Sequence, residues 1–89
     1  MNLTFEDFNL AKKIVDNIID NTNIIEIENK LRNIINDYTG NKRRQFLCHL
    51  NALFLNILLN ELTFKCKEAE EKAIKARLIT KTLIENLED

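Results

Sequence analysis

Apolar residues follow a helical spacing in the first quarter of the chain. They recur every three or four positions after Thr4, which places them on one face of an amphipathic helix. Thr4 is a good N-cap for this helix, with Asp7 three residues further on. Four polar residues, 20–23, favour local side-chain hydrogen bonds and end it. The pattern predicts a helix over residues 4–21. Its apolar stripe is Phe8, Ala11, Ile14, Val15, Ile18 and Ile19.

A second helix is predicted over residues 24–39. Asn23 and Glu26 have the spacing of a capping box, and Gly40 stands where a left-handed residue ends a helix. Asn41 can cap the next helix directly, and such short connections make neighbouring helices antiparallel. The first 39 residues therefore predict an antiparallel helical hairpin. The stripe of its second helix is Ile24, Ile27, Leu31, Ile34, Ile35 and Tyr38.

The remaining residues, 41–88, predict one long third helix that packs against the hairpin. Apolar residues continue at near-heptad spacing, and neither Gly nor Pro interrupts them. Residues 60–64 are the place where this helix could break, and the Glu61–Lys65 pair favours continued helix across them. Such a helix is about 70 Å long, so its far half has to pack against a second copy. The stripe is Phe46, Leu50, Leu53, Ile57, Leu62, Cys66, Ala69, Ala73, Ala76, Thr80, Leu83 and Leu87.

The alternative is a break near residues 60–64. Thr63 is then the N-cap of a fourth helix, and the chain closes into a four-helix bundle. Either arrangement is all-α and forms a single domain over residues 1–89. The continuous helix is the preferred prediction, and with it a homo-oligomer.

The segment from Phe46 to Leu59 is apolar on nearly all sides of a helix, so it should be buried on nearly all sides. It is either a central core helix or a surface for self-association or target binding. The side chains predicted to pack between subunits or against a target are Leu47, Phe54, Leu58 and Leu62. Small side chains that would allow close helix approach on the far half are Ala69, Ala73 and Ala76.

Composition supports the helical prediction and restricts the classes of partner. The chain has no Pro and one Gly, so turn chemistry is nearly absent. A net charge of −1 favours neither nucleic acid nor membranes. The sequence starts without the basic-then-apolar order of a signal peptide, which predicts a cytoplasmic protein with Cys48 and Cys66 as buried free thiols.

Candidate chemistry is sparse. Lys42, Arg43 and Arg44 lie in the first turn of the third helix, where free N–H groups favour anions, and could hold a phosphate with Tyr38 stacked on a base. The simpler interpretation is a solvated basic turn that pairs with Asp37 or with a neighbour's acids, and a Tyr38 that lies in the core. His49 lacks further metal ligands at a suitable spacing. We find no nucleophile–base pair and no Gly-rich loop, and expect neither an enzyme nor a cofactor.

The sequence is most consistent with a small cytoplasmic protein–protein interaction module, oligomeric and without membrane contact. Its abundant Asn, Ile and Lys are typical of AT-rich genomes, which suggests an inhibitor, immunity or counter-defence protein of a phage, mobile element or low-GC bacterium. One alternative is an oligomer that binds a nucleotide or nucleic acid through the basic turn. Another is a structural or assembly subunit.

Overall fold

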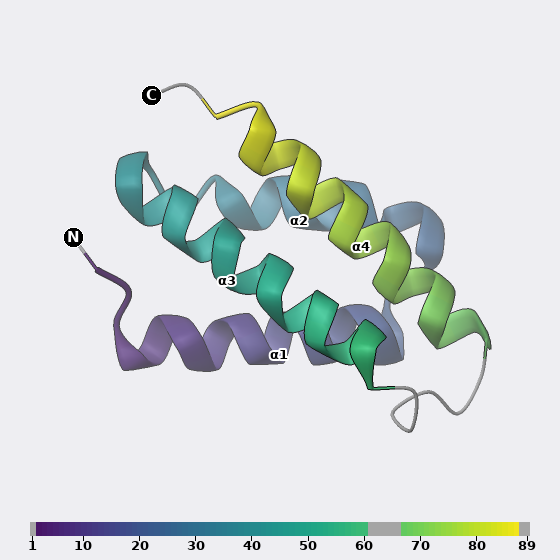
Figure 1. Cartoon of the computed structure of the whole chain (residues 1–89). Helices are drawn as coiled ribbons and strands as arrows, with labels where there is room; N and C mark the ends of the chain where they lie inside the picture. Colours follow the sequence, from purple (N-terminus) through teal and green to yellow (C-terminus); the bar gives the residue numbers. More distant parts are fainter. Residues whose placement is uncertain (1, 61–66, 88–89) are drawn as a thin grey trace.

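The computed structural model describes residues 2–60 and 67–87, and these residues form helices and connecting turns only (Figure 1). The helices are α1 (Phe5–Asn21), the short 3₁₀ helix η1 (Ile24–Glu26), α2 (Ile27–Ile35), α3 (Gly40–Leu59) and α4 (Lys67–Glu85). The predicted all-α class is confirmed. The longest dimension of the protein is 37 Å, which excludes a helix of about 70 Å.

Helix α1 is capped at both ends by side chains. At its start the predicted cap is present: the Asp7 N–H donates to Thr4 Oγ1 (3.2 Å), and the Thr4 N–H donates to Asp7 Oδ2 (2.8 Å). At its end α1 has no basic residue of its own. Lys30 of α2 supplies the positive charge, donating to Asn17 Oδ1 and to Thr22 Oγ1 (3.2 Å). A cation at this position is favoured by the helix dipole.

The second predicted helix is shorter than expected. It starts as η1, where Asn23 Oδ1 accepts from the Ile25 N–H (3.2 Å), and α2 ends at Ile35. Turn bonds such as that from the Tyr38 N–H to the Ile35 carbonyl (3.1 Å) tighten the chain after it. Gly40 has the predicted positive φ (+55°), but it opens α3 and does not close α2. Thr39, and not Asn41, is the N-cap of α3.

The preferred prediction of one continuous third helix is wrong. Helix α3 ends at Leu59, because Asn60 leaves helical geometry (φ −104°, ψ 87°). Helix α4 then runs back beside α3 in the opposite direction, which is the predicted alternative (Figure 1). A pair such as Glu61–Lys65 is worth only about 0.2–0.5 kcal/mol in a helix, whereas burying one Leu side chain is worth about 1.5–3 kcal/mol. Packing α4 back against α3 is therefore more stable than continuing α3 as one long helix. Glu61, Thr63 and Lys65 themselves lie outside the described residues.

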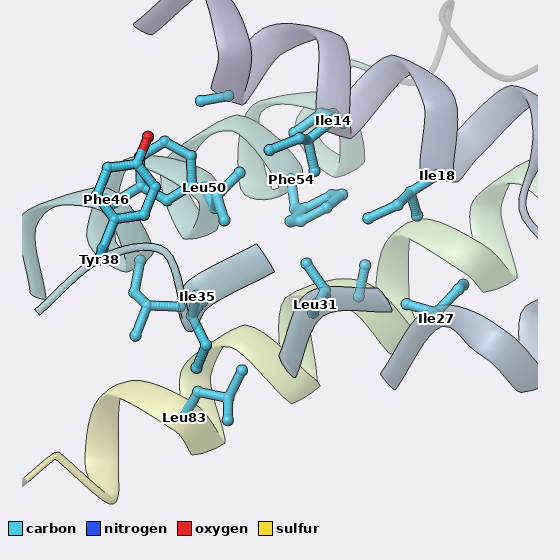
Figure 2. Close-up of a cluster of buried hydrophobic side chains, with 14 residues drawn as sticks. Ile14, Ile18, Ile27, Leu31, Ile35, Tyr38, Phe46, Leu50, Phe54 and Leu83 are labelled. Carbon is cyan, nitrogen blue, oxygen red and sulfur yellow. The ribbon is translucent and has the colours of Figure 1, made fainter. Parts of the chain in front are cut away.

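The core forms around α3, whose inner face meets the other three helices. Figure 2 shows Phe54 near Ile14 and Ile18 of α1 and near Leu31 of α2. At one end of this cluster, the Tyr38 ring stacks on Phe46 with 4.2 Å between ring centroids. The fully buried large side chains are Ile18, Ile27, Leu31, Phe46, Leu47, Leu50, Phe54 and Thr80.

Candidate functional site

The basic turn at the start of α3 is bound to the protein's own polar groups. Lys42 Nζ lies 3.2 Å from Asp7 Oδ2, and Arg43 Nε donates to the Tyr38 carbonyl (2.6 Å). Lys42, Arg43 and Arg44 are all half-buried. The structure thus places the three predicted cations together, but two of them already have an anion or a carbonyl as partner. The turn is thus paired within the chain, as the simpler interpretation has it, but the acid that pairs with Lys42 is Asp7 of α1 and the turn is half-buried, not fully solvated.

Tyr38 is a core residue with one polar contact. Its ring is buried, with one side against Phe46, and its hydroxyl donates to Asp7 Oδ1 (3.0 Å). Burial raises the pKa of Tyr38 to about 12, and the hydrogen bond and negative charge of Asp7 add to the effect. The ring is therefore not presented to solvent as a stacking surface for a base.

The Asp7 carboxylate accepts from four donors: the Thr4 backbone N–H, the Thr4 hydroxyl, the Tyr38 hydroxyl and Lys42 Nζ. The Thr4 backbone hydrogen bond is the largest reason that the pKa of Asp7 is lowered from 3.8 to about 2; the side-chain bonds from Thr4, Tyr38 and Lys42 also lower it. We call Thr4, Asp7, Tyr38 and Lys42 the Asp7 cluster. It joins the start of α1 to the turn between α2 and α3.

A shallow hollow of about 250 Å³ lies beside the Asp7 cluster. Its lining residues are Asp37, Tyr38, Thr39, Asn41 and Lys42. Its one lysine is paired with Asp7, and Asp37 adds a carboxylate to the rim. An anion entering here would meet one carboxylate on the rim and a cation that is already neutralised. The hollow consequently offers little to a phosphate.

The side chains predicted to form an interface have different positions in the fold. Leu47 and Phe54 are fully buried in the core of one chain, so the prediction that they pack between subunits is corrected. Ala73 and Ala76 are also fully buried, on the helix that packs most extensively on α3. The reason is the return of α4, which supplies from the same chain the surface expected from a second copy. Leu58 and Ala69 are half-buried, and Leu62 lies outside the described residues.

The side of α3 that faces solvent is unusual because it lacks charge. Between Phe46 and Asn60 the sequence contains no Asp, Glu, Lys or Arg. Spacings of four, three and four residues place Cys48, Ala52, Leu55 and Leu59 in one stripe, which we call the outer α3 face. Cys48 and Ala52 are exposed, Leu55 is half-buried, and Leu59 is 74% exposed. The prediction that the Cys48 thiol is buried is therefore wrong, because no other helix in the described ranges covers this side of α3; Cys66 lies outside the described residues.

An aromatic contact joins α1 to α3 at His49, the residue after Cys48. The exposed ring of Phe8 meets His49 edge-on, with 4.7 Å between ring centroids. His49 is half-buried there, which places the only histidine in a packing contact at the border of this face. Phe5, one turn before Phe8, is also exposed. The Phe8–His49 contact thus packs α1 against α3 next to the first residue of the outer α3 face.

The sequence signal for this face is the segment from Phe46 to Leu59, which is apolar on nearly all sides of the helix. An apolar segment covering most of a helix circumference needs cover on every side, and the bundle fully buries Phe46, Leu47, Leu50 and Phe54 but leaves other apolar positions of the segment exposed. Cys48, Ala52 and Leu59 fall outside the predicted stripe of α3. Leu47 and Phe54 also fall outside that stripe but are fully buried, so the sequence indicates surplus apolar surface on α3 without indicating which part of it stays exposed.

Other kinds of site find little support in the described parts of the chain. Residues 2–60 and 67–87 contain no group of three or more His, Cys, Asp or Glu side chains that could hold a metal ion. None of the helices described is both long and apolar enough to cross a membrane. Comparison with known proteins adds no candidate: neither a protein family, nor a curated protein, nor a solved structure matches the chain.

Proposed function

We propose that this protein is an interaction module that binds another protein through the outer α3 face. The observation that carries the proposal is the exposed, uncharged stripe of Cys48, Ala52, Leu55 and Leu59. An apolar stripe loses little hydration energy on binding, whereas a charged one has to be desolvated. Contiguous exposed apolar surface on a small protein typically marks an interaction site.

The small size of the chain agrees with a protein that acts by occupying a partner's surface. We propose a cytoplasmic role of the inhibitor, immunity or counter-defence type, in which a rigid bundle presents one helix face. The pre-formed core supports this role, because a rigid binding face loses little conformational entropy on binding. A nucleotide or nucleic-acid ligand has less support, since Lys42 and Arg43 are engaged within the chain.

The test begins with a photoreactive amino acid placed at Ala52, in the middle of the outer α3 face. A second version carries it at Lys13, an exposed position of α1 and a matched control. We expect one discrete cross-linked partner from position 52 in producing cells and none from position 13. The partner is then purified, and its affinity for the protein is measured by titration calorimetry.

Two substitutions of the same chemistry complete the test. Leu59→Asp places a charge on the outer α3 face, and Leu10→Asp places one on an exposed apolar position of α1. We expect Leu59→Asp to weaken binding of the purified partner by at least about tenfold and Leu10→Asp to leave it unchanged. Equal cross-linking from both positions, or unchanged binding by Leu59→Asp, would overturn the proposal.

A further inference from the structure

A second exposed apolar surface lies on another side of the bundle, where α2 packs on α4. A hollow of about 150 Å³ is lined there by Glu28, Arg32, Leu78, Ile79 and Thr82. Its α2 wall is formed by charged side chains, and its α4 wall is largely apolar. This combination is typical of a surface that can receive an apolar side chain and hold it between polar neighbours.

Exposed apolar side chains surround this hollow. Leu78, in its wall, is 53% exposed, and Ile74 lies one helical turn before it and is 42% exposed. Ile25 precedes Glu28 by three residues, which places it on the same side of the η1–α2 segment, and it is 75% exposed. None of the three belongs to a stripe that the bundle needs for its core. We call Ile25, Glu28, Arg32, Ile74 and Leu78 the α2–α4 face.

The charges in the wall of this hollow form a pair on one helix. Glu28 Oε2 and Arg32 Nε are 3.0 Å apart, at positions i and i+4, and both side chains remain half-exposed. When two such helices meet antiparallel about a two-fold axis, each Glu28 lies opposite the Arg32 of the other helix. The pattern is therefore complementary to itself. A partner carrying one sign of charge would instead meet a like charge at one of the two positions.

We propose that the α2–α4 face binds a second copy of this chain, forming a two-fold symmetric dimer with antiparallel α2 helices. Apolar rim residues of one protomer, Ile25 or Leu78, enter the hollow of the other and contribute most of the affinity. On dimerisation, Glu28 and Arg32 exchange their ion pair within one helix for ion pairs across the two-fold axis. They therefore set orientation and specificity more than affinity. The dimer leaves the outer α3 face open, and this inference does not depend on the proposed function of that face.

The experiment uses two charge reversals and their mixture, followed by sedimentation equilibrium over a wide concentration range. Glu28→Arg opposes Arg to Arg across the two-fold axis, and Arg32→Glu opposes Glu to Glu. We expect each variant alone to weaken dimerisation by at least about tenfold. An equimolar mixture of the two should dimerise again, because a protomer with two cations at these positions then faces one with two carboxylates. The double variant, Glu28→Arg with Arg32→Glu, should also dimerise.

Two controls separate this inference from misfolding and from the proposed function. Both charged positions are half-exposed, so circular dichroism should show unchanged helix content; Leu78→Lys gives an independent disruption of the apolar rim. Leu59→Asp, on the outer α3 face, should leave the dimer intact. A wild-type protein that stays monomeric at every concentration overturns the inference. So does a mixture that fails to restore dimerisation.

Discussion

Lys42 Nζ lies 3.2 Å from Asp7 Oδ2, so the first turn of α3 is joined to the first turn of α1 by an ion pair whose carboxylate side chain is only 13% exposed. The same carboxylate accepts from the buried Tyr38 hydroxyl. A basic turn that suggested ligand binding is thereby part of the structure that holds the N-terminal helix to the turn after α2. Removing the Lys42–Asp7 ion pair should therefore lower the free energy of unfolding before it affects any binding.

Asp7 gives the fold a dependence on acidic pH. Because its pKa is lowered in the folded state from 3.8 to about 2, its stabilising effect is complete above about pH 4 and is lost as the pH falls towards 2. We expect urea denaturation of the wild type to show stability falling across this window. Asp7→Asn should be less stable at pH 7 and should lose less stability between pH 4 and 2.

The matched control for Asp7→Asn is Asp16→Asn, an exposed aspartate on the same helix. It should retain the wild-type fall in stability between pH 4 and 2. An Asp7→Asn profile parallel to that of the wild type would show that the Asp7 cluster does not couple protonation to folding.

The titration of the Tyr38 hydroxyl at alkaline pH is a second test of the Asp7 cluster. It is the only tyrosine, and the chain has no tryptophan, so phenolate absorbance measures this one group. Its raised folded-state pKa of about 12 stabilises the fold up to about pH 10, and this contribution is lost as the pH rises through 12. We expect a titration midpoint well above 10, and a lower midpoint in Asp7→Asn. A wild-type midpoint of 10 with helix content retained would contradict the buried position of Tyr38.

Phe54 distinguishes a core from an interface. It is fully buried beside residues of α1 and α2 (Figure 2), so Phe54→Ala should lose about 3–5 kcal/mol of unfolding free energy. The exposed Leu59→Ala should change it by less than about 0.5 kcal/mol. Thermal denaturation followed by circular dichroism measures both. If Phe54→Ala keeps the wild-type melting temperature and changes only the state of association, the side chain belongs to an interface after all.

Gly40 tests the backbone at the start of α3. A Cβ at this position meets nothing within 4 Å, so only the positive φ of +55° opposes a side chain. Gly40→Ala should therefore cost about 1–2 kcal/mol, and Gly40→Asn less, because Asn tolerates the left-handed region better. Urea denaturation of the two variants gives the order. Equal stability of Gly40→Ala and wild type would mean that the turn has another conformation.

Local sequence patterns were enough to predict the helical class, the Thr4–Asp7 cap, the positive φ of Gly40 and most of the buried stripes of α1 and α2. These features depend on local spacing and on contacts within a few residues, which the order of amino acids fixes directly. The sequence also made residues 46–59 apolar around most of the helix. It placed Lys42, Arg43 and Arg44 together without showing what they contact.

The other features depend on contacts between residues far apart in the sequence. Whether the third helix continued past Asn60 depended on comparing one local ion pair with the burial of a whole helix, and local patterns do not contain the second quantity. The pairing of Lys42 with Asp7 joins residues far apart in sequence, so only the packed fold could show that the basic turn is engaged. The return of α4 placed Leu47 and Phe54 inside one chain and left Leu59 outside, because the surface covering each side of α3 is set by the arrangement of all four helices.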